Sequence, residues 1–126
     1  AAGHDVVNDG NPFSNAGLLG IIFIDDSSLV AHWVSPDVSA DVIGRIDSNT
    51  GTITEIARLI CFQGLSCSTE HHGGNLTRAP DGTIYFGIGD FFIPALHAQN
   101  PNSPGGKIHR LARDGSMSVY ALGLRN

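Results

Sequence analysis

Charged residues are scarce in this chain, and basic residues are the scarcer kind. Only 15% of its 126 residues are charged, with 7 Lys and Arg against 12 Asp and Glu and a formal net charge of -5. The basic residues are also scattered along the sequence, so no run of them could neutralise a row of phosphates. We therefore expect no nucleic-acid partner.

Long apolar runs are lacking too. The longest, residues 16–24, has nine residues and stops at Asp25 and Asp26. A helix needs ~20 consecutive apolar residues to cross a membrane. We therefore expect no membrane span.

Cysteine is limited to Cys61 and Cys67, which are separated by five residues with Gly64 at the centre. This spacing exceeds the two to four residues typical of a structural zinc knuckle, so zinc is not expected. The loop either closes as a local disulfide or leaves two free thiols, and both alternatives stay open. If the disulfide forms, the compartment is oxidising, which means a periplasmic or secreted protein.

Glycine, with 16 copies, is by contrast abundant, and 41% of the residues are hydrophobic. This composition favours short strands joined by tight turns over helices or disorder, so we expect an all-β fold. Turn signals lie at Asn49-Thr50-Gly51, Asp81-Gly82 and Asp114-Gly115, each flanked by strand-like runs. Each signal predicts a β-hairpin. The intervals of 31 and 33 residues suggest a repeated four-stranded unit, as in a propeller blade.

The most informative segment is residues 70–90. Glu70, His71 and His72 stand before a Gly-Gly turn, and a strand-like run then ends at Asp90. A carboxylate that meets an imidazole fixes its tautomer and stabilises the cation it forms, so His71 and Asp90 are candidates for a general base and the group that orients it. His72 points away from His71 if the segment is extended, which makes it a structural residue or a fallback base. Outside any family context, a His-His pair beside a Gly-Gly turn is more often a surface loop.

Four segments, in this order, resemble the soluble quinoprotein glucose/sorbosone (aldose sugar) dehydrogenases: residues 15–21, 70–90, 105–115 and 122–126. These proteins are six-bladed β-propellers that use pyrroloquinoline quinone. The resemblance implies a sugar or aldose substrate, with quinone and calcium as cofactors and most of their ligands outside this chain. It also implies roles for six residues: His71 as catalytic base, Asp90 as its orienting group, Glu70 and Asn15 in substrate binding, and Arg125 and Asn126 in cofactor binding.

Length limits what this chain can do. Six blades of ~40 residues need roughly 250 residues, so residues 1–126 supply two to three blades of a partial β-propeller that cannot close a ring alone. We expect the chain to be inactive by itself. Open strand edges and the apolar face of Ile84, Phe86 and Ile88 are expected to be uncovered, and either the missing remainder of the propeller or a homo-oligomer would cover them.

A second function class is a non-enzymatic binding module derived from the same propeller. The joint presence of His71, Asp90 and Arg125 favours the enzyme, because a binding module does not need all three residues.

Overall fold

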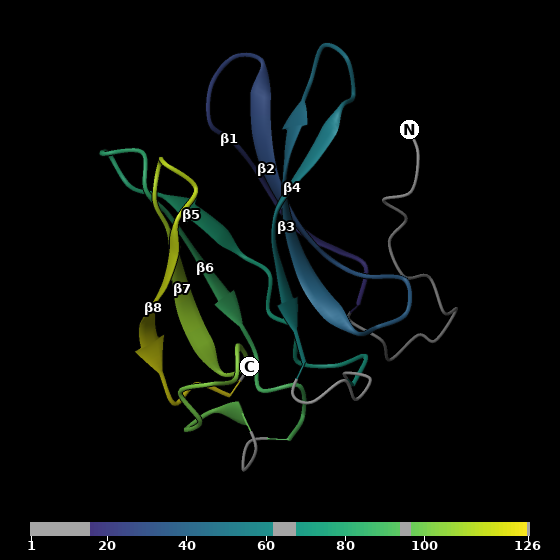
Figure 1. Ribbon diagram of the computed structural model, residues 1–126, viewed down its shortest axis with the longest axis vertical. Coiled ribbons are helices and arrows are strands. Elements are labelled where there is room, and N and C mark those ends of the chain that lie inside the picture. The colour runs from purple at the N-terminus through teal and green to yellow at the C-terminus, as the bar shows by residue number, and fades with distance from the viewer. Residues whose placement is uncertain (1–15, 62–67, 94–96, 126) are drawn as a thin grey trace.

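The computed structural model describes residues 16–61, 68–93 and 97–125. They form two four-stranded antiparallel sheets, which stand side by side in Figure 1. The first sheet contains, in spatial order, β1 (Leu18–Phe23), β2 (Ser28–Val34), β3 (Ala40–Asp47) and β4 (Ile53–Ile60). The second contains β5 (Leu76–Arg78), β6 (Ile84–Ile88), β7 (Lys107–Leu111) and β8 (Met117–Leu122). Each sheet is a meander like a propeller blade, so the expected all-β partial propeller is confirmed, with two blades.

All three predicted hairpins are present. Gly51, Gly82 and Gly115 lie in the turns between β3 and β4, β5 and β6, and β7 and β8, with φ values of 71°, 87° and 87° that favour glycine. The repeat differs from the expectation, however. Gly51 and Gly115 each link the third and fourth strands of a sheet, whereas Gly82 links the first and second. The blade therefore repeats over the 64 residues from Gly51 to Gly115, and the intervals of 31 and 33 residues connect unlike hairpins.

The main core lies between the two sheets. Ile84, Phe86 and Ile88 alternate along β6 and are almost fully buried, in one cluster with Val30 of β2 and Ile43 of β3. The expectation that this face is uncovered was wrong, because the first sheet of the same chain covers it. Large apolar side chains are exposed instead on β1 (Leu18, Ile21 and Phe23) and on β8 (Val119, Tyr120 and Leu122).

Two composition-based expectations can be compared with the fold. Cys61, at the end of β4, is disulfide-bonded, while Cys67 lies outside the described residues. Among the described residues, no helix is long and apolar enough to cross a membrane.

Candidate functional site

His71 and Asp90 meet at the same end of the second sheet. His71 lies before β5 and Asp90 two residues after β6, and Nδ1 of the imidazole is 2.7 Å from Oδ1 of the carboxylate. The expected hydrogen bond is therefore present. Asp90 is fully buried, whereas 14% of the His71 side chain is exposed. Because a carboxylate accepts, Nδ1 donates, and Nε2 is left with the lone pair that a base requires.

The backbone at this pair is strained. Four non-glycine residues in the described part of the chain have positive φ, and three of them are His71 (58°), Phe91 (53°) and Phe92 (64°). Such conformations cost on the order of 1–3 kcal/mol each and persist only where the surroundings enforce them. The turn that holds Phe92 closes with its N–H donating to Asp90 Oδ1 at 3.1 Å. The Phe92 ring stands edge-on to the His71 imidazole, with centroids 5.0 Å apart.

Glycines allow the histidine segment to cross the end of β6 closely. The carbonyl of His71 lies where a Cβ on Gly89 would be, and a Cβ on Gly73 would be 2.7 Å from the carbonyl oxygen of Gly87. The N–H of Gly74 also donates to that Gly87 carbonyl at 3.1 Å. Glycine is thus required by packing at residues 73 and 89, since a side chain at either position would displace the histidine segment.

A hollow of about 380 Å³ opens beside this segment. Arg125 lines it, and its main-chain carbonyl accepts from the N–H of Asp90 at 2.6 Å. The other described residues around the hollow include no acid: Gly73, Gly74, Asn75, Gly87, Ile88, Gly89 and Leu124. A guanidinium without a competing carboxylate suits a ligand carboxylate or another anionic oxygen.

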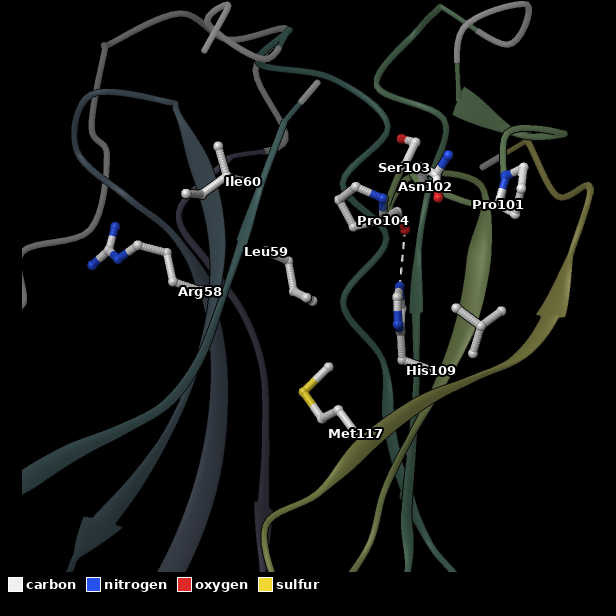
Figure 2. Close-up of a pocket in the computed structure, with 10 residues that line it drawn as sticks. Arg58, Leu59, Ile60, Pro101, Asn102, Ser103, Pro104, His109 and Met117 are labelled. Atoms are coloured by element: carbon white, nitrogen blue, oxygen red, sulfur yellow. Dashed lines mark hydrogen bonds between the residues drawn. The ribbon is translucent and has the colours of Figure 1, made fainter. Parts of the chain in front are cut away.

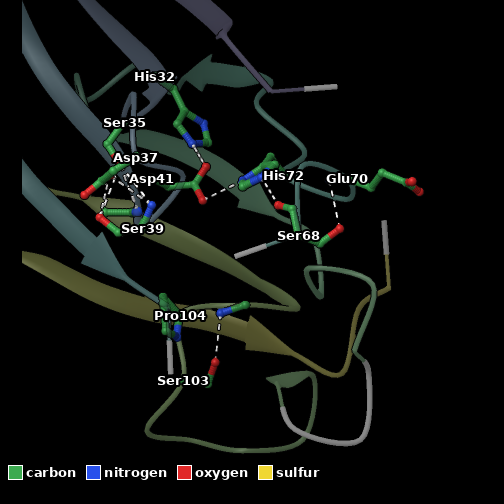
Figure 3. A network of polar contacts seen from close by, with 12 residues as sticks. His32, Ser35, Asp37, Ser39, Asp41, Ser68, Glu70, His72, Ser103 and Pro104 are labelled. Atoms are coloured by element: carbon green, nitrogen blue, oxygen red, sulfur yellow. Dashed lines mark hydrogen bonds and ion pairs between the residues drawn. The ribbon is translucent and has the colours of Figure 1, made fainter. Parts of the chain in front are cut away.

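The remaining predicted site residues are placed only in part. Glu70 is half-buried, and its N–H donates to Ser68 Oγ at 3.2 Å. Its side chain extends away from His72 in Figure 3. Asn15 and Asn126 lie outside the described residues.

The structure adds a buried network that sequence reasoning missed (Figure 3). His32 Nε2 lies 2.6 Å from Asp41 Oδ1, and His72 Nδ1 lies 2.9 Å from Asp41 Oδ2; all three side chains are fully buried. Neither His32 nor Asp41 is among the site residues predicted from the sequence. The signal was available, because a histidine within the apolar strand β2 must find a polar partner when buried.

A second hollow, of about 320 Å³, lies between β4 and the second sheet (Figure 2). His109 borders it, donates from Nε2 to the carbonyl of Pro104 at 2.9 Å and stacks on Phe86 with centroids 5.2 Å apart. Burial lowers the pKa of His109, so the ring is neutral near pH 7. His109 is therefore a packing residue.

This fold and site define a two-blade segment of a β-propeller with a histidine–carboxylate pair at one end. The chain matches the model of the Glucose / Sorbosone dehydrogenase family over residues 14–121, and it therefore belongs to this family.

Solved structures agree with this assignment. A PQQ-bound aldose sugar dehydrogenase from Streptomyces coelicolor is 28% identical, with a TM-score of 0.74 over 92% of this chain and 39% of that one. A glucose dehydrogenase from Thermus thermophilus is 25% identical, with a TM-score of 0.68 over 90% of this chain and 40% of that one. An apo-form aldose sugar dehydrogenase from Escherichia coli, 21% identical with a TM-score of 0.68, shares the fold over 99% of this chain and 42% of that one. No curated protein matches the sequence. The chain thus spans about two fifths of the structures it resembles.

Proposed function

We propose that this chain is the part of a pyrroloquinoline quinone-dependent sugar or aldose dehydrogenase that carries the catalytic base, and that it is inactive without the rest of the propeller. The observation that carries the proposal is the His71–Asp90 hydrogen bond at 2.7 Å, beside a hollow lined by Arg125. Strain on three residues around this bond supports it, because strained backbone concentrates at functional sites.

His71 performs the proton transfer in this proposal. Its Nε2 takes the proton of a sugar hydroxyl, and the negative charge left on that oxygen drives loss of hydride from the carbon that bears it. Asp90 keeps the second ring proton on Nδ1 and stabilises the imidazolium that forms. The quinone, when bound, supplies the acceptor for the hydride. The sugar leaves oxidised, as a lactone or an aldehyde oxidation product. The proton that it lost stays on His71.

The residues present fit one edge of the quinone. Arg125 lines a hollow that no described acid borders, and its planar guanidinium is the kind of group that holds a carboxylate or quinone oxygen. Asn126 is proposed to assist, with Glu70 and Asn15 on the sugar. The described residues contain no group of three His, Cys, Asp or Glu able to hold a metal ion. We therefore assign the calcium ligands to the remainder of the propeller.

The disulfide-bonded state of Cys61 supports a periplasmic or secreted location, where such bonds persist. We propose that the remaining blades, or further copies of the chain, cover the open edges of the two sheets.

The test uses this chain extended to the length of its relatives, with quinone and calcium added. We expect quinone-dependent oxidation of an aldose with an artificial electron acceptor. Arg125→Ala should weaken quinone retention before it affects the proton transfer. An extended chain that folds, binds no quinone and oxidises no aldose would overturn the proposal. That result would favour the alternative, a non-enzymatic binding module.

A further inference from the structure

His72 makes hydrogen bonds through both ring nitrogens, and both partners are oxygens that accept. Nδ1 is 2.9 Å from Asp41 Oδ2, and Nε2 is 2.6 Å from the main-chain carbonyl of Ser68. A carbonyl has no proton to give, so Nε2 must donate. The charge of the ring therefore depends on which of Nδ1 and Asp41 Oδ2 holds the proton between them.

The protonation state of Asp41 decides where this proton lies. Burial acts to raise the pKa of Asp41, but the hydrogen bonds from His32 and His72, together with positive charge on this histidine pair, outweigh burial and hold the pKa below its ordinary value. An ionised Asp41 can only accept, so Nδ1 of His72 donates as well, and the ring is an imidazolium.

His32 is the neutral histidine of this network. Its Nε2 donates to Asp41 Oδ1, and its buried Nδ1 has no hydrogen-bond partner among the described residues. A bare lone pair there costs less than a buried proton without an acceptor. The further titratable group that faces Asp41 and His32 is His109, and burial keeps it neutral. One cation and one anion then cancel within the buried network, which is the condition for burying charge at all.

The network also joins two parts of the fold that otherwise meet here through close contacts of Gly74 with Leu19 and Gly20. Asp41 and His32 belong to the first sheet, whereas His72 belongs to the segment that crosses the end of β6 in the second. His71, the next residue, has its strained φ of 58° and its ring turned to Asp90. Anchoring His72 on one side fixes the peptide from which the His71 side chain departs on the other.

We propose that His72 is a positioning residue: a buried imidazolium paired with Asp41 that ties the histidine segment to the first sheet and holds the His71 ring against Asp90. The charge assignment does not depend on the proposed function, because it rests on the hydrogen bonds of His72 and on the ionised Asp41. The consequence for catalysis rests on the proposed function.

The first experiment is ¹⁵N NMR of the histidine rings in the 126-residue chain at pH 7.5. Both nitrogens of His72 should be protonated, and His32 should carry a proton on Nε2 only. Asp41→Asn is the matched variant, because its amide oxygen still accepts from His32 and its amide N–H can donate to His72 Nδ1. It keeps every bond and should convert His72 to a singly protonated ring. A singly protonated His72 in the unaltered chain overturns the proposal, whether or not the variant folds.

The second experiment separates positioning from general support. His72→Gln and His32→Gln each remove one hydrogen bond from the same carboxylate, but only the first lies beside His71. The Nδ1 proton of His71 should lose its hydrogen-bonded signal in His72→Gln and keep it in His32→Gln. In the extended, quinone-loaded chain, His72→Gln should lower kcat about tenfold or more with little change in KM, as misplacement of a catalytic group does. His32→Gln should stay within about threefold of the unaltered enzyme, as expected for a side chain that does not hold a reacting group in place.

The outcomes are distinguishable. If the extended chain without any substitution shows no activity, the proposed function is wrong. The NMR result still decides the charge of His72. An unchanged His71 signal and kcat in His72→Gln defeat the positioning role.

Discussion

The carbonyl oxygen of His71 lies against the α-carbon of Gly89, in the space that a side chain on residue 89 would fill. Gly87, two residues earlier, has nothing within 4 Å of the corresponding position. The two glycines therefore differ in their room for a side chain: residue 89 has none, whereas residue 87 borders the hollow that Arg125 lines.

Gly89→Ala should push the His71 peptide away from β6 and break the alignment with Asp90. We expect turnover in the extended chain to fall by about 100-fold, the scale of an ~1 Å misplacement. Ser118→Ala, at an exposed position of β8, should retain turnover. The measurement is kcat together with thermal unfolding, and equal activity of the two variants would show that the close contact does not position the base.

Lys107 should contribute to stability through its buried amine. Its Nζ donates to the carbonyls of His97 and Gly105 at 2.8 and 2.7 Å, and burial lowers its pKa. Lys107→Met leaves both carbonyls without this donor and should reduce the free energy of unfolding by about 2 kcal/mol or more.

Arg110, on the same strand but half-exposed, is the control for that change. Arg110→Met should cost less than about 0.5 kcal/mol, as surface substitutions do. Urea unfolding compares the two variants. Equal losses would mean that the lysine hydrogen bonds add nothing.

Acid should weaken the fold through Asp41. Because its folded pKa is below the ordinary value, the carboxylate contributes stability that is fully present above about pH 4 and is lost as the pH falls through the folded pKa. Asp41→Asn should therefore flatten the decline of unfolding free energy below about pH 4. Parallel acid profiles of the two proteins, measured by urea unfolding, would contradict this.

The chain on its own should associate. Ile21 and Phe23 of β1 are 55% and 61% exposed, and the two sheets leave open edges. Apolar surface and unpaired strand edges favour contact with further chains. Sedimentation should show an oligomer that Ile21→Ser with Phe23→Ser weakens. A monomer at high concentration would mean that this face needs no cover.

The hairpins were predictable because their information is local. Gly51, Gly82 and Gly115 specify turns that neighbouring residues cannot override, and the approach of His71 to Asp90 follows from one hairpin and the motif around it. The cover of Ile84 was not predictable, since alternation shows which residues share a face but not what packs on it. Asp41 was missed for a similar reason. Its partners come from β2 and from a segment 31 residues further on, so only the packing of the two sheets reveals them.

The central claim is that His71 is the base of a quinone-dependent sugar dehydrogenase. The most direct test is the turnover of His71→Ala in the extended chain with quinone and calcium bound, compared with Ser118→Ala on the exposed side of β8 as a control. We expect turnover to fall by at least ~100-fold while quinone binding is retained, the scale for loss of a general base. Undiminished turnover in a folded, quinone-loaded His71→Ala protein would contradict the account.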